Sequence, residues 1–381
     1  MLDFLKFSIT DNGLIHYLEN HILLDWVQNE DKINLFDIEV VKTKTVKQYK
    51  GILFCIYSNR IDVFFKPHYY FNGNLHNAND FKINDCINVV LELKNAFKID
   101  LKLLKVVNVE FGLNVVSPID VKKLIAYLVY HEKNEFKTDA GLAFSKKSYK
   151  ANLNGTINNY KIIKAYAKGL QYSKYADVNT FRFEIKSKQS KYINKLCIYS
   201  ANDLLNFNTY ENLVKEIISE FDKVLLLDCE TDFSSLKQSE QSKITNYLNT
   251  ITWFKISQDC YRNRFNKEKI KYCNLVNKVQ NNLKNQLDKI ILNKLEFLKS
   301  GAISTHSKNI KSGAISNIYK GGICTKTENS VLALLVNKKV QFNTSYQEQK
   351  KAITEYNRLA VIRYNQRTKT ITSNCVNEVN Y

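Results

Sequence analysis

The most restrictive feature of the sequence is a strict alternation of apolar and polar residues at 107–115, Val-Asn-Val-Glu-Phe-Gly-Leu-Asn-Val. Successive side chains of a strand point to opposite faces, so Asn108, Glu110, Gly112 and Asn114 share one face. The segment therefore predicts a strand with one face in the core and one polar face. A buried carboxylate needs a partner or a metal ion, which makes Glu110 a candidate functional residue. A polar sheet face in water is the alternative.

The first half of the chain continues with other runs of strand-forming residues. Strands are predicted over residues 1–10, 32–41, 48–57, 60–71, 105–116, 141–150, 158–169 and 179–188. Helical spacing of apolar residues predicts a helix over 80–97, capped by Asp80, and another over 118–131, with Pro118 in its first turn. Because several strands follow one another directly, we expect an α+β fold whose antiparallel or mixed sheet is covered by helices.

From about residue 200 the pattern becomes helical, with predicted segments over 200–227, 239–254 and 269–299. Ser-Gly-Ala-Ile-Ser then occurs at 300–304 and again at 312–316, in a lysine-containing stretch that we interpret as a linker. The predicted domains are a sheet-containing domain at 1–225, a helical domain at 226–299, and a basic linker and tail, partly flexible, at 300–381.

The charge balance points to a polyanionic partner. Fifty-six Lys and Arg residues against thirty-seven Asp and Glu residues give a net charge of +19, which favours salt-dependent binding of nucleic acid. An anionic membrane surface is the weaker alternative, because the sequence offers no basic amphipathic helix with a wide apolar face. Apolar runs stay well short of the ~20 residues of a membrane span, and residues 1–10 do not resemble a secretion signal. A cytoplasmic location in a bacterial cell is expected.

Eight cysteines are scattered without a Cys-x-x-Cys pair, which argues against a zinc ribbon and a disulfide scaffold. We expect reduced and mostly buried thiols. They are Cys55, Cys86, Cys197, Cys229, Cys260, Cys273, Cys324 and Cys375.

Residues 68–81, HYYFNGNLHNANDF, mix histidines, asparagines and tyrosines. His68 and His76 are candidate metal ligands, although an isolated histidine is more often structural and the pair lacks a metal-binding spacing. Asparagine side chains such as Asn77 and Asn79 suit contacts to phosphates or bases.

Residues 160–169 and 181–186 bring cations, a carboxylate and a tyrosine onto single strand faces. Lys164, Tyr166 and Lys168 share a face of the first strand. A tyrosine between two cations suits attack on a phosphodiester, since positive charge favours the phenolate and neutralises the phosphate. If the second strand pairs with the first, Glu184 and Glu110 lie on the same side of the sheet as Tyr166.

The order of these motifs resembles that of the gene II-type replication initiators of filamentous phages and their rolling-circle relatives. The resemblance covers about residues 50–225 and rests on the segments HYYFNGNLHNANDF, VEFGLN, KAYAKGLQY and FRFEIKSKQSKYINKLCIYSANDLL. It implies an HUH-like core and a site-specific endonuclease in domain 1–225. In that mechanism a tyrosine attacks origin DNA, remains linked to the 5′ phosphate and frees a 3′ hydroxyl as primer, with Mg²⁺ or Mn²⁺ as cofactor.

Carried over by position, the resemblance assigns roles to five residues. The nucleophile is Tyr166, and Lys168 is the adjacent cation. The implied metal ligands are His68, Glu110 and Glu184. Apart from the resemblance, the polar strand faces and the loop at 68–81 predict six DNA-binding residues, namely Lys164, Arg182, Lys186, His76, Asn77 and Asn79.

The sequence also departs from the family pattern. It contains no His-hydrophobe-His pair, and the acidic residue between the tyrosine and the lysine is replaced in Tyr166-Ala167-Lys168. The implied partners are the origin of a circular phage or plasmid replicon, with a host helicase and polymerase. The alternative is a non-catalytic DNA-binding protein that assists or regulates replication.

Overall fold

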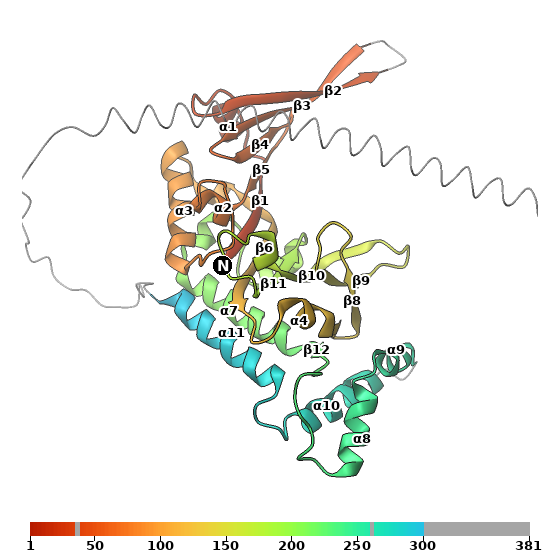
Figure 1. Ribbon diagram of the computed structural model, residues 1–381. Coiled ribbons are helices and arrows are strands. Elements are labelled where there is room, and N and C mark those ends of the chain that lie inside the picture. The colour runs from red at the N-terminus through yellow and green to blue at the C-terminus, as the bar shows by residue number, and fades with distance from the viewer. Residues whose placement is uncertain (35–38, 260–262, 301–381) are drawn as a thin grey trace, which may run out of the picture. The chain divides into compact units, whose positions relative to one another are not determined.

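The computed structural model describes residues 1–34, 39–259 and 263–300. Its strands form one twelve-stranded sheet in the order β12-β7-β8-β9-β10-β11-β6-β1-β5-β4-β3-β2, in which neighbours run antiparallel (Figure 1). The strands are β1 (Leu2–Ile9), β2 (Asp25–Asn34), β3 (Glu39–Tyr49), β4 (Ile52–Ile56), β5 (Ile61–Phe65), β6 (Lys105–Val116), β7 (Leu128–His131), β8 (Asn134–Thr138), β9 (Ser145–Ala151), β10 (Ile157–Ala167), β11 (Thr180–Ser187) and β12 (Val224–Leu226).

Helices lie between the strands and follow them. They are α1 (Asn12–Glu19), α2 (Pro67–Phe71), α3 (Ile83–Phe97), α4 (Val121–Tyr127), α5 (Lys168–Gln171), α6 (Ser190–Lys195), α7 (Phe207–Asp222), α8 (Gln238–Tyr247), α9 (Thr250–Gln258), α10 (Arg264–Val276) and α11 (Leu283–Lys299), with short 3-10 turns at Leu101–Leu103 and Ala201–Leu205. The predicted α+β fold with a helical region after the sheet is confirmed.

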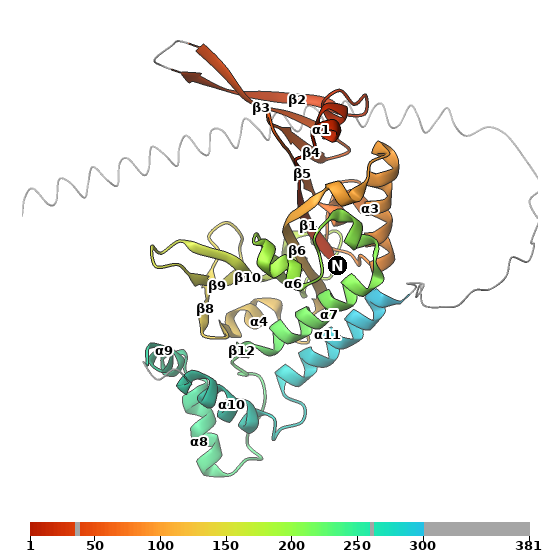
Figure 2. The same ribbon diagram turned by 180° about the vertical axis from the view of Figure 1, so that it is seen from behind.

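Strand β6 lies inside the sheet, between β11 and β1. Four apolar residues of its alternating segment are almost completely buried, namely Val109, Phe111, Leu113 and Val115. They join a core that contains apolar residues of α3, α7 and α11, and both views show these helices on the same side of the sheet (Figures 1 and 2). The opposite face of β6 carries the polar residues.

The predicted helix over 118–131 is wrong in its second half. Helix α4 begins at Val121, with Asp120 as the cap that accepts a hydrogen bond from the Lys122 amide at 2.7 Å, and it ends at Tyr127. Leu128–His131 is strand β7, which pairs with β12. An unbroken apolar run fits a helix or a buried strand equally well, and pairing with a distant segment decides between them.

The predicted capping role of Asp80 is also wrong. Helix α3 begins three residues later, and the Asp85 carboxylate accepts a hydrogen bond from the Lys82 amide at 3.1 Å. Asp80 instead forms an ion pair with Lys294 of α11, with Nζ–O distances of 2.9 and 3.0 Å.

Helices α8, α9 and α10 form a smaller body around the buried indole of Trp253. Its core also includes Tyr130 of β7 and Leu227, which follows the edge strand β12. The chain leaves the sheet after β12 and returns to the main core with α11. Asp228 joins the two ends, because its Oδ2 accepts a hydrogen bond from the Leu283 amide at 2.7 Å.

The described cysteines carry thiols, as expected. Cys55 and Cys86 are buried, but Cys197 and Cys229 are exposed, so the expectation of mostly buried thiols holds only in part. The predicted linker and tail after Ser300 lie outside the described residues, as do Cys260, Cys324 and Cys375. Within the described part of the chain, the helices are too short or too polar to cross a bilayer.

Candidate active site

The polar face of the central strands brings together residues far apart in the sequence. In the register of β10, β11 and β6, Lys164 lies opposite Glu184, and Glu184 lies opposite Gly112. Two positions along, on the same face, Lys186 lies opposite Glu110. The predicted convergence of these two carboxylates on one side of the sheet is therefore present in the fold.

Two lysines connect the carboxylates. The Lys164 ammonium donates to Glu110 Oε2 at 2.6 Å and to Glu184 Oε1 at 2.9 Å, and Lys186 donates to Glu110 Oε1. Burial and the neighbouring charge of Glu184 raise the pKa of Glu110. Burial would also raise the pKa of Glu184, but Lys164 and Arg182 outweigh it and hold that pKa well below the usual range.

Tyr166 points its hydroxyl at the buried carboxylate. The phenol donates a hydrogen bond to Glu184 Oε2 at 2.9 Å, and the Arg182 Nε donates to the same oxygen at 3.2 Å. Burial and the Glu184 charge raise the pKa of Tyr166 well above its ordinary value. The tyrosine is thus a neutral phenol in this environment, and it needs a base to become a phenolate.

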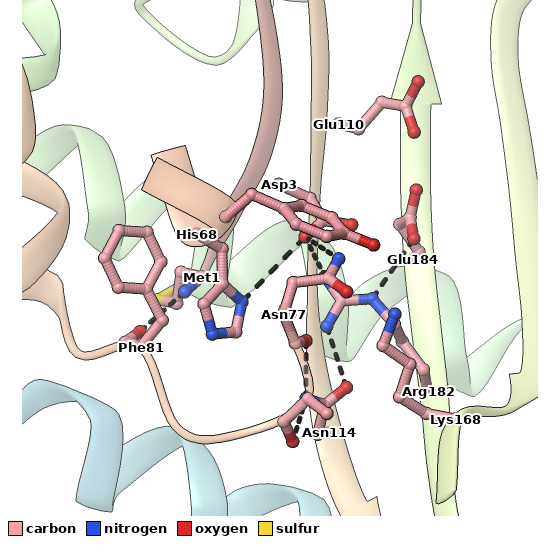
Figure 3. Close-up of polar contacts among 12 residues, drawn as sticks. Met1, Asp3, His68, Asn77, Phe81, Glu110, Asn114, Lys168, Arg182 and Glu184 are labelled. Carbon is pink, nitrogen blue, oxygen red and sulfur yellow. Dashed lines mark hydrogen bonds and ion pairs between the residues drawn. The ribbon is translucent and has the colours of Figure 1, made fainter. Parts of the chain in front are cut away.

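Arg182 organises this end of the site (Figure 3). Its guanidinium donates to Asn114 Oδ1 at 2.8 Å and pairs with Asp3 Oδ1 at 2.9 Å. Asp3, on strand β1, was missed from the sequence. It is the one carboxylate of that strand, which also contains Lys6 and Ser8, and the reasoning applied to the carboxylate of Glu110 would have found it.

Lys168 begins α5, directly after β10, and only 1% of its surface is exposed. Its ammonium donates to Gln171 Oε1 at 3.0 Å and lies 5.4 Å from the ring centre of Tyr166 and 4.5 Å from that of Tyr172. Burial and the Arg182 charge lower the pKa of Lys168 to about 7. A group that changes charge near neutral pH beside a tyrosine can exchange protons with a substrate.

His68 lies in the first turn of α2 and not at the end of a strand, as we had expected. Its ring stacks on Phe81, with ring centres 4.7 Å apart, and its Nε2 lies 2.8 Å from Asn79 Oδ1. Its Nδ1 lies 3.9 Å from Asp3. Burial and nearby positive charges, the first being the Met1 amine, lower the pKa of His68 to about 2, so the ring is neutral.

The loop after α2 is packed inward. His76 stacks on Tyr175, with ring centres 3.9 Å apart, and Asn77 donates to Asp3 Oδ1 at 2.8 Å. Asn79 exchanges hydrogen bonds with Asn72. These side chains hold the loop against the site, and their assignment to DNA binding remains a prediction.

The implied metal set does not fit an ion in this arrangement. The Glu110 and Glu184 carboxylates are engaged by lysine, arginine and tyrosine side chains. Within the described residues, the donors of His68 and the two glutamates do not gather within one coordination sphere. The assignment of His68, Glu110 and Glu184 as ligands therefore remains a prediction, and the proposed reaction does not use a metal ion bound to them.

A different group could bind a metal ion. Donor atoms of His131, Glu132 and Glu220 all lie within 4.8 Å of one another. Two lysine ammonium groups already form ion pairs with these carboxylates. The Lys161 Nζ lies 2.7 Å from a carboxylate oxygen of Glu220 and 3.1 Å from one of Glu132. The Lys223 Nζ lies 2.6 Å from the other oxygen of Glu220. An ion would have to displace Lys161 from between the two carboxylates.

The chain matches no protein-family model, and the comparison with curated proteins gives no match. Among solved structures, the fold is similar to a rolling circle replication initiator protein from Geobacillus stearothermophilus, with a TM-score of 0.35 and 10% sequence identity. The similarity covers 65% of this chain and 94% of that one. The likeness is distant in both sequence and geometry.

Proposed function

We propose that the protein initiates rolling-circle DNA replication by nicking one strand of origin DNA with Tyr166 as the nucleophile. The observation that carries the proposal is the 2.9 Å hydrogen bond from the Tyr166 hydroxyl to Glu184, a carboxylate flanked by Arg182 and Lys164. A nucleophile, a base and cations on one sheet face are the parts that phosphoryl transfer requires. The order of motifs in the sequence points to the same reaction.

The proposed chemistry builds on these contacts. When the DNA phosphate attracts Arg182 and Lys164, Glu184 loses the charges that lower its pKa and becomes a stronger base. Glu184 then accepts the phenol proton while the tyrosine oxygen attacks the scissile phosphorus, forming a tyrosine–5′-phosphate bond and breaking the bond to the 3′ oxygen. The departing 3′ oxygen takes a proton, and Lys168 is the proposed donor. Arg182 and Lys164 offset the negative charge that develops on the phosphate. A divalent ion, when bound, would supply further Lewis-acid stabilisation.

We place this activity in the cytoplasm of a bacterial host, on the origin of a circular phage or plasmid replicon. A free 3′ hydroxyl needs a polymerase, and the parental duplex must be unwound, so host polymerase and helicase are the partners that follow from the reaction. The net charge of +19 suits a protein that works on DNA.

A nicking assay on supercoiled DNA of the protein's own replicon tests the proposal. Wild type should form a covalent protein–DNA adduct that survives denaturation, and Tyr166→Phe should form none while binding DNA with unchanged affinity. The assay is run with Mg²⁺, with Mn²⁺ and with a chelator. An adduct of undiminished yield from Tyr166→Phe would show that another residue is the nucleophile.

The second candidate is a DNA-binding protein without nuclease activity that assists or regulates replication. It is favoured by one observation, namely that Tyr166 is only 8% exposed and both glutamates are engaged by cations. This candidate requires salt-sensitive DNA binding by wild type with no nick and no adduct in any metal condition.

A further inference from the structure

The body formed by α8, α9 and α10 has a strong positive charge of its own. Between residues 237 and 278 the sequence has nine Lys and Arg residues against three Asp and Glu residues. This body contributes nothing to the site around Tyr166, which is built from the sheet and its adjoining helices. Its charge therefore calls for a separate explanation.

A hollow of about 440 Å³ lies between α8 and α10. Three lysines and two asparagines line it, together with the apolar Leu275 and a tyrosine ring. The polar lining residues of α8 are Lys243, Asn246 and Tyr247. Those of α10 are Lys271 and Asn274, and Lys278 follows this helix.

The lysines of this hollow are available to a ligand. Lys271 pairs with Glu268 at 2.7 Å and Lys278 pairs with Glu240, but the side chains of both lysines are at least half exposed. Exposed pairs of this kind contribute ~0–1 kcal/mol and are easily exchanged. Lys243 is exposed and has no partner among the described residues.

Lysine ammonium groups with amide and hydroxyl donors make up a site for phosphates, in which position and not base sequence is recognised. The three lysines come from α8, from α10 and from the turn after α10, so the positive charge is spread over the hollow. Charge that is spread in this way suits a continuous phosphodiester backbone better than one small anion.

We propose that the hollow between α8 and α10 binds the phosphodiester backbone of duplex DNA. This second contact would hold the origin duplex while the sheet acts on one strand. The inference rests on the proposed DNA function, but it does not depend on Tyr166 being the nucleophile.

The test compares the full-length wild type with Lys243→Glu/Lys271→Glu. The control is Lys255→Glu/Lys289→Glu, which makes the same charge change at exposed lysines outside the hollow. Affinities for a random-sequence duplex and for a single strand of equal length are measured by fluorescence anisotropy at several salt concentrations. Adduct formation on the single strand is measured in parallel.

The hollow variant should bind the duplex at least tenfold more weakly than wild type. The slope of its log affinity against log salt concentration should be smaller by about two released counterions. The control should stay within threefold, and adduct yield on the single strand should be unchanged in both. Equal duplex affinity for the hollow variant and the control would overturn the inference, and so would a loss confined to the single strand. If wild type bound neither DNA, the proposed function itself would fail.

Discussion

At the scale of single residues, Lys168 has the most informative charge state. It is enclosed between two tyrosine rings and Arg182, and its pKa is lowered from 10.5 to about 7. Below pH 7 the amine is protonated, and above pH 7 it is neutral in the folded protein although it would be charged in an unfolded chain. Glu184, with a pKa far below 7, and Tyr166, with a pKa far above it, do not titrate in this range.

If Lys168 gives the proton to the departing 3′ oxygen, nicking should fall as pH rises. The protonated fraction drops from about nine tenths at pH 6 to about one tenth at pH 8 for a pKa near 7. We therefore expect kcat/KM, which reports pKa values of the free enzyme, to fall roughly ninefold over this interval.

The matched variant is Lys168→Met, which keeps the length of the side chain and removes the charge. It should be slower at pH 6 and show no decline up to pH 8. A variant that keeps the decline of the wild type would assign the titration to another group.

At the scale of elements, the close approach of β6 and β11 depends on Gly112. A Cβ atom at this position would lie 2.2 Å from the Phe183 carbonyl oxygen and 2.8 Å from the Glu184 Cα. Gly112→Ala should therefore push the strands apart and lower the free energy of unfolding by ~1–3 kcal/mol, the usual cost of overpacking. Urea denaturation measures the change.

Gly141→Ala is the control for this prediction. Its Cβ would meet only Asp139 Oδ1 at 3.7 Å, and its backbone has no positive φ. Its stability should stay within ~0.5 kcal/mol of wild type. An equal loss in both variants would mean that the contact with Phe183 is not the cause.

Strands with a regular alternation of apolar and polar residues were predicted correctly from the sequence. Strands that form because they pair with another segment were not. The alternation of residues 107–115 identifies β6 and its polar face without reference to any other segment. Leu128–His131 and Val224–Leu226 continue helical patterns. Val224–Leu226 pairs as a strand with Leu128–His131, which pairs with β8 on its other side. Pairing across so long a separation leaves no local trace.

The same division holds for the candidate site. Tyr166, Glu184 and Glu110 could be grouped from alternation once the pairing of their strands was assumed, because strands fix side-chain direction. The place of His68 could not, since it depends on a short helix that packs against Phe81. Asp3, on the first strand of the sequence, forms an ion pair with Arg182 of β11. The two residues meet because of the order of strands in the sheet, which no local sequence pattern predicts.

At the scale of the whole molecule, α11 brings the end of the helical region back to the sheet. Leu287, Ile291 and Leu295 are at most 2% exposed and belong to the same core as β6. Ile291→Ala should cost ~2–5 kcal/mol, the range for deleting a buried aliphatic side chain. The loss should appear in the urea transition of the sheet as well as that of the helices.

The neighbouring Leu292, which is 46% exposed, supplies the control. Leu292→Ala should change the free energy of unfolding by no more than ~0.5 kcal/mol. If Ile291→Ala left the urea unfolding transition of the sheet unchanged, residues 226–299 would fold as a separate domain.

The bond between Asp228 and the Leu283 amide has a consequence for how this protein can change over generations. It holds the two ends of the α8–α10 segment side by side. Recombination can therefore replace the residues between these ends without changing how the strands of the sheet pair. Descendants could in this way acquire a different α8–α10 body while the site around Tyr166 stays unchanged.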